Sequence, residues 1–128
     1  MISRITMTAL TAMSLAAPAF AHHSYAMFDR SKTIVLSGAV KSVQMINPHS
    51  WLQIVVLDDQ GKSITWSLEM GPPRTLVRDG WAPGAVQAGD PVTLKIHPMR
   101  DGTHAGQLVN AKLASGKTIG GGGPEAEE

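Results

Sequence analysis

The chain has 128 residues, with 11 Lys and Arg against 10 Asp and Glu, and it contains no cysteine. This length suits one compact domain. The missing cysteine excludes disulfides, thiol chemistry, cysteine-based zinc sites and a lipid anchor attached through cysteine. The balanced charge argues against nucleic acid or anionic lipid as a partner, because both need clustered Lys and Arg.

The first 21 residues have the pattern of a signal peptide. Arg4 supplies the positive charge, residues 5–17 form an apolar run too short to span a membrane, and residues 19–21 read Ala-Phe-Ala, a signal-peptidase site. We expect cleavage after Ala21 and a periplasmic or secreted protein. Removing 21 of the 128 residues leaves a chain of 107 that begins at His22.

The next segments predict an arm and a long first strand. Residues 22–33 show no clean period and contain Tyr25, Met27 and Phe28, with which an ordered arm would dock on the domain. Residues 34–46 alternate like a strand but change phase, which predicts a bulge near Lys41-Ser42. Asn47 to Ser50 is a turn by composition.

The remaining elements follow from alternation and from glycine and proline. A second strand is expected at 51–57 and a third at 62–70, with Trp66 and Leu68 inward and Glu69 outward, where it would pair with Arg74 or Arg78. A short helix over 74–79 would end at Gly80, with Trp81 folding back on it. The fourth strand has Val92, Leu94 and Ile96 inward and His97 outward, and the fifth spans 107–113 with Val109, Ala111 and Leu113 inward.

Three strands, a short helix and two further strands predict an all-β fold, a small five-stranded antiparallel barrel of the oligonucleotide/oligosaccharide-binding (OB) type. The alternative is a small antiparallel sandwich. The expected organisation is a signal peptide at 1–21, an N-terminal arm at 22–33, the barrel at 34–119 and a flexible acidic tail at 120–128. Trp66, Leu68, Val92, Leu94 and Val109 should be buried. We expect a monomer without a membrane span.

Several motifs resemble a family of small exported bacterial proteins of unknown function. They are His22-His23-Ser24-Tyr25 with Phe28-Asp29, Gly38-x-Val40, Asn47-Pro48-His49-x-Trp51, Trp66 with Glu69, Gly80-Trp81, Gly89-Asp90-x-Val92 and Asn110-Ala111. The likeness covers nearly all of residues 22–113. It implies an exported β-barrel domain and brings no established activity, so no catalytic residue can be transferred.

The histidines are the candidate metal ligands. A free His22 would offer its α-amine and its imidazole Nδ1 to one metal, and copper accepts such nitrogen ligands. His49 is the best third ligand, because proline makes its loop rigid; His23 and His97 are weaker candidates, and His104 is expected to be a solvent-facing loop residue. The competing interpretation is that His22 and His23 are solvated and that His49 only hydrogen-bonds its turn.

The function expected from this pattern is copper binding or delivery by an exported protein. The alternative is a metal-free module that binds a protein or an envelope component. A copper-dependent oxidase is a third hypothesis, which lacks a substrate platform. The chain has no phosphate-binding loop, no nucleophile elbow and no carboxylate pair spaced for acid–base work, so we expect it not to be an enzyme.

Overall fold

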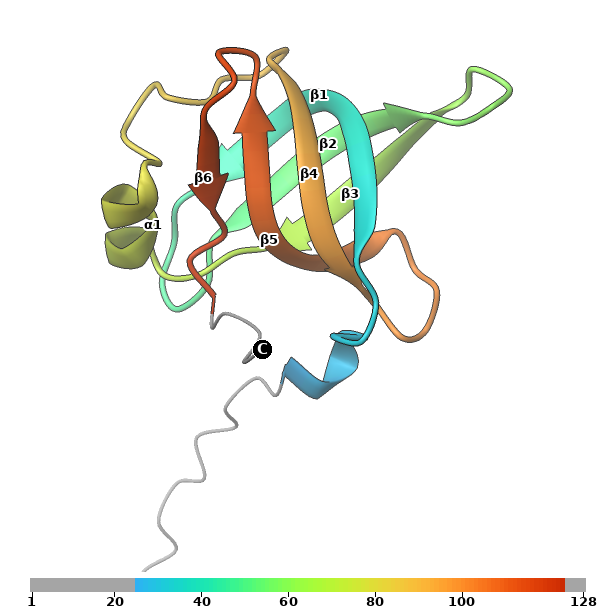
Figure 1. Ribbon diagram of the computed structural model, residues 1–128, viewed down its shortest axis with the longest axis horizontal. Helices are drawn as coiled ribbons and strands as arrows, with labels where there is room; N and C mark the ends of the chain where they lie inside the picture. Colours follow the sequence, from blue (N-terminus) through green and yellow to red (C-terminus); the bar gives the residue numbers. More distant parts are fainter. Residues whose placement is uncertain (1–24, 124–128) are drawn as a thin grey trace, which may run out of the picture.

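The computed structural model describes residues 25–123, so the expected signal peptide, His22, His23 and residues 124–128 lie outside the described part of the chain. The elements, shown in Figure 1, are η1 (Tyr25–Met27), β1 (Ile34–Gln44), β2 (Trp51–Leu57), β3 (Ser63–Glu69), α1 (Pro73–Asp79), β4 (Pro91–Pro98), β5 (Ala105–Leu113) and β6 (Thr118–Gly120).

The strands form a closed barrel. The long β1 bends, pairing with β4 over its first half and with β2 over its second half, and its register shifts between Val40 and Ser42. A parallel pairing between β3 and β5 closes the barrel. The predicted all-β barrel with one short helix between strands 3 and 4 is confirmed, as is the bulge in the first strand.

Gly38 lies where β1 passes close to β2. A Cβ at this position would overlap the carbonyl oxygen of Val55, so only glycine fits the close approach. The bend at this point lets one strand pair at both its ends, which the barrel needs for closure.

The core lies between the strands and is made mainly of aliphatic side chains, together with Met70 and Trp81. Leu68, Val92 and Leu94 are buried as predicted. Trp66 is only half-buried, although it packs against the core. The prediction that Val109 points inward is wrong, because Val109 is 37% exposed.

A second bulge, in β5, explains the error at Val109. Lys95 of β4 pairs with Asn110, whereas the next residue, Ile96, pairs with Leu108. Val109 is therefore an extra residue in the ladder, and the inward phase switches from Ala111 to Leu108 across it. Both Leu108 and Ala111 are fully buried.

The short helix ends as predicted, at a left-handed glycine. Gly80 has φ of 114°, and the backbone N–H of Trp81 donates to the Leu76 carbonyl at 2.9 Å. The Trp81 indole N–H donates to the carbonyl of Gly120 at 2.7 Å, which joins the helix end to β6.

The glycine-rich segment expected to begin a flexible tail is packed. Gly120 belongs to β6, a sixth strand that pairs with β5. The N–H of Gly121 donates to Val109 and that of Gly71 to Gly121, at 2.9 and 2.8 Å. A Cβ on Gly71 would overlap the carbonyl oxygen of Gly122. Glycine here permits close backbone contact.

The described part of the arm is docked on the end of β4. Phe28 is 2% exposed and forms a β-bridge with Met99. The Asp29 N–H donates to Pro98 at 2.8 Å, and the Arg100 N–H donates to Met27 at 3.0 Å. Figure 1 places η1 and the end of the segment after β6 at the same end of the barrel. Within residues 25–123, no helix has the length and apolar character needed to cross a membrane.

Candidate metal site

The loop between β1 and β2 presents His49 at a fixed position. The hydroxyl of buried Ser50 lies 3.3 Å from both the N–H and the carbonyl of Ile46. The Ser50 N–H donates to Gly71 at 3.1 Å, and its carbonyl accepts from Met70 at 2.8 Å. The Asn47–Pro48 peptide is cis. These bonds attach the loop to the end of β3, so His49 is held beside that strand.

His49 contacts Glu69 there. Its Nδ1 lies against Oε1 of Glu69, whose side chain is only 5% exposed, while that of His49 is 20% exposed. The prediction that Glu69 pairs with Arg74 or Arg78 is wrong. Glu69 does lie on the outer face of the strand, as expected, but His49 and the N-terminal arm cover that face, and Arg78 lies 3.8 Å from Asp79.

A row of buried polar side chains continues from Glu69 across the barrel. Glu69 of β3 pairs with Gln107 of β5, which pairs with His97 of β4. All three belong to the outer face, since their neighbours Leu68 and Ile96 point into the core. Each is nevertheless buried, with exposures of 4%, 4% and 6%. We call these three residues the outer row.

His97 is not the solvent-facing residue that alternation predicts. Its Nδ1 lies 2.8 Å from the carbonyl oxygen of Lys32, which fixes Nδ1 as the donor. The ring points outward from the barrel, but the N-terminal arm crosses it there. Alternation identifies the face of a strand and not what covers that face.

Tyr25 brings the arm to the same place. Its ring is stacked on that of His49, with centroids 6.1 Å apart and planes 24° apart. Burial raises the pKa of the Tyr25 hydroxyl, and the nearby carboxylate of Glu69 raises it further. Tyr25 and His49 therefore form a cluster at the Glu69 end of the outer row.

The other candidate ligands are placed differently. His22 and His23 lie outside the described residues. His104 is exposed in the β4–β5 loop, as predicted, and its ring lies 5.1 Å from that of Trp66. Among residues 25–123, no group of three or more His, Cys, Asp or Glu side chains could hold a metal ion.

Sequence reasoning missed Gln107. The position of Gln107 in the sequence could have revealed it, because Gln107 alternates in phase with the apolar residues Val109 and Ala111 of the predicted fifth strand. A polar residue in that phase indicates a bulge between it and the rest of the strand, and the structure has that bulge at Val109. Once the phase switches, Gln107 points to the outer face beside Glu69.

A family model described as a family of unknown function (DUF6152) matches residues 10–109. The chain belongs to this family. The matched region includes the arm, the His49 loop and the whole outer row, and it ends before β6. No curated protein and no solved structure matches the chain.

Proposed function

We propose that this chain is an exported β-barrel protein that binds one Cu(II) ion through a mature N-terminal His22, with His49 as the third nitrogen ligand. The signal-peptide pattern supports export, and cleavage after Ala21 would supply the free α-amine. The observation that carries the proposal is the stacking of the Tyr25 ring on the His49 ring.

Tyr25 limits how far His22 can be from His49. Consecutive Cα atoms are about 3.8 Å apart, so three peptide units keep the Cα of His22 within about 11 Å of that of Tyr25. Tyr25 itself contacts His49. One metal ion can therefore be reached from both histidines without any rearrangement of the barrel.

Glu69 prepares His49 as a ligand. A carboxylate bonded to Nδ1 selects the neutral tautomer whose lone pair is on Nε2, the nitrogen that would bind the metal. Carboxylates commonly orient metal-binding imidazoles in this way and increase their basicity. This pairing supports a ligand role for His49 over a role confined to its own turn.

His23 and His97 are the weaker ligands. Neighbouring residues on an extended segment point to opposite sides, so His22 and His23 do not readily bind one ion. The Nδ1 of His97 is bonded to the Lys32 carbonyl, and its ring is buried. Copper suits the remaining set because imidazole and amine nitrogens bind it well and it leads the divalent affinity series.

The role that we assign is binding or delivery of copper, without catalysis. The test is a Cu(II) titration of the mature chain with a native His22 terminus, beside a version with one extra N-terminal residue. Extension, or His49→Ala, should weaken binding, whereas His104→Ala should not. Affinity should also fall from about pH 8 to 5, because protons compete for the imidazoles and for the α-amine, whose reference pKa is about 7.7–8.0. Equal affinity in the native and extended proteins would refute the proposal.

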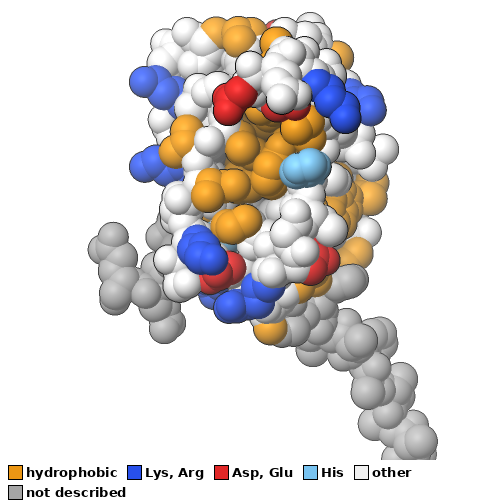
Figure 2. All heavy atoms as spheres, turned by 90° about the vertical axis from the view of Figure 1, so that its right-hand side faces the viewer, with side chains coloured by type: hydrophobic (Ala, Val, Ile, Leu, Met, Phe, Trp, Pro, Cys, Tyr) orange, Lys and Arg blue, Asp and Glu red, His pale blue; other side chains and the backbone are white. Residues whose placement is uncertain are grey.

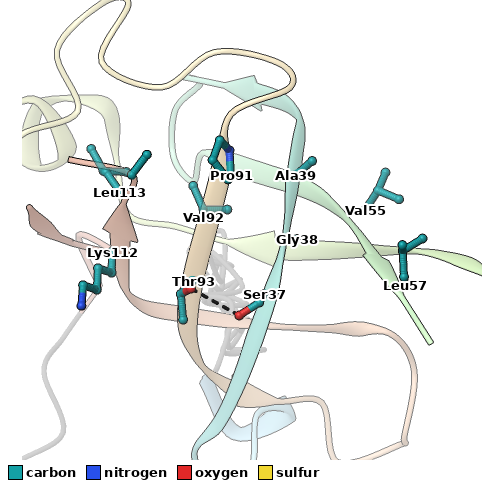
Figure 3. Close-up of a pocket in the computed structure, with 11 residues that line it drawn as sticks. Ser37, Gly38, Ala39, Val55, Leu57, Pro91, Val92, Thr93, Lys112 and Leu113 are labelled. Atoms are coloured by element: carbon teal, nitrogen blue, oxygen red, sulfur yellow. Dashed lines mark hydrogen bonds between the residues drawn. The ribbon is translucent and has the colours of Figure 1, made fainter. Parts of the chain in front are cut away.

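The second candidate is a metal-free interaction module. Figure 2 shows hydrophobic side chains gathered on the face seen from the right of Figure 1, with charged side chains around them. An open hollow of about 840 Å³ lies where β1 bends, lined by apolar residues that include Val55, Leu57 and Leu113 (Figure 3). Leu57 is 64% exposed. Such a surface suits an apolar partner. The interaction module becomes the leading function if the N-terminal extension leaves the Cu(II) affinity unchanged.

A further inference from the structure

The hollow at the bend of β1 has the size and lining of a ligand site. It is lined by residues of the neighbouring strands β2, β1, β4 and β5. Its volume of about 840 Å³ lies within the range of small-molecule sites, which are mostly apolar and contain few polar groups. The hollow is remote from the His49 loop, because Leu57 and Trp51 are the opposite ends of β2, about 20 Å apart along the strand.

An apolar path crosses the hollow from β2 toward β5. Ala39 of β1 pairs with Val55 of β2 on one side and with Pro91 of β4 on the other. Leu57 adds a largely exposed apolar side chain at the β2 end. The path from β2 to β5 crosses three strand spacings of about 4.8 Å each, which gives it a length of about 14 Å. An elongated apolar group therefore fits the hollow better than a compact one.

The polar groups of the hollow give this path a direction. The hydroxyls of Ser37 and Thr93 lie 3.3 Å apart and hydrogen-bond each other, so they do not call for a polar ligand. Thr93 pairs with Lys112 of β5, which is the only charged residue among those described as lining the hollow. Figure 3 shows Lys112 on one side and Leu57 on the other, with β4 and β1 between them. The hollow is thus apolar over most of its length and positive at the β5 end.

We propose that this hollow binds a free fatty acid, with the alkyl chain over Val55 and Ala39 and the carboxylate beside Lys112. The charge of the carboxylate complements that of the lysine, and the chain covers the exposed Leu57. An anionic membrane surface fits less well, because it attracts clusters of basic residues and the hollow has one. The inference goes beyond the proposed copper site and does not depend on it.

Dodecanoate is the probe, titrated calorimetrically and without metal into the mature chain that begins at His22. This chain lacks the apolar run at residues 5–17, which could itself bind a fatty acid. One dodecanoate should bind per chain. Decanoate should bind about fourfold more weakly, because complete burial of two methylene groups is worth about fifteenfold and an open hollow covers about half of each.

Two variants test the two ends of the site. Lys112→Gln should weaken dodecanoate binding by up to about fivefold, the upper limit for an exposed ion pair, and leave the binding of uncharged dodecanol unchanged. Its control is Arg74→Gln, which removes the same charge from the exposed face of α1. Leu57→Ser should weaken the binding of both ligands, whereas Val77→Ser, at an exposed position on α1, should not. All four positions are exposed, so each variant should fold.

Several results would overturn the inference. Dodecanoate might fail to saturate one site, or Lys112→Gln and Arg74→Gln could weaken it equally. Binding to phosphatidylglycerol vesicles without binding to dodecanoate would assign the surface to a membrane. A dimer in size-exclusion chromatography that Leu57→Ser converts to a monomer would show that a second copy covers the hollow. The Cu(II) affinity of Lys112→Gln should equal that of the parent, so failure here leaves the proposed function standing.

Discussion

Removing the imidazole of His49 should strongly destabilise the metal-free protein. In His49→Ala, the carboxylate of Glu69, which is only 5% exposed in the parent protein, would lose its described partner. Breaking a buried pair by removing one member costs about 3–5 kcal/mol, because an uncompensated charge remains. Since His49 is 20% exposed, water can partly replace it, and we expect the lower end, about 3 kcal/mol. That is a large share of the 5–15 kcal/mol that typically stabilises a domain.

Urea unfolding followed by tryptophan fluorescence at neutral pH measures this loss. The double variant His49→Ala, Glu69→Gln should recover part of it, because no buried charge remains. The control is His104→Ala, because His104 is an exposed histidine. This variant should lower the free energy of unfolding by less than about 1 kcal/mol. A loss below about 1 kcal/mol in His49→Ala itself would refute a buried His49–Glu69 pair.

Two further predictions test the bulge and the arm. Leu108→Ala should lower the free energy of unfolding by about 2–5 kcal/mol, as for a buried leucine, whereas Val109→Thr, at an exposed position, should change it by no more than about 0.5 kcal/mol. Urea unfolding measures both changes. A larger loss in Val109→Thr than in Leu108→Ala would show that β5 has no bulge at this position. The hydrogen bond from the Ser31 hydroxyl, and after it Lys32, lowers the pKa of Asp29 below its ordinary value of 3.8. The ionised Asp29 carboxylate therefore stabilises the fold above its unfolded pKa, and this stabilisation is lost as the pH falls through its folded pKa. An NMR titration should show the pKa of Asp29 moving up toward 3.8 in Ser31→Ala, and an unchanged value would contradict the assignment.

The architecture could be predicted because its signals are local. The phase change near Lys41-Ser42 marks the first bulge, and the alternation of β3 and β4 marks their inward faces. Gly80 marks the helix end through its backbone conformation. The bulge at Val109 was missed because Val109, Ala111 and Leu113 alternate regularly without it, and the polar Gln107 in the same phase was not taken as its sign. The packed glycines after β6 were missed because composition does not distinguish close contact from flexibility.

The candidate site could be predicted only in part. His49 was selected because its loop is rigid, and the structure holds that loop through Ser50. Its partner Glu69 was assigned to the correct face but to the wrong partner. Alternation gives the direction of a side chain, whereas burial of an outer face depends on which distant segments cover it. No pattern within β3 or β4 encodes the arm that covers Glu69 and His97.

Barrel closure itself creates the outer row. Glu69 and Gln107 are neighbours only because β3 and β5 pair in parallel at the closing seam, in the register Ser67–Ala105, Leu68–Gly106 and Glu69–Gln107. A Cβ on Gly106 would overlap the carbonyl oxygen of His97, so the small residue at this position allows β4 to approach β5 closely. The same backbone contacts therefore close the fold and place Glu69, the partner of His49, beside Gln107 on the outer face of the barrel.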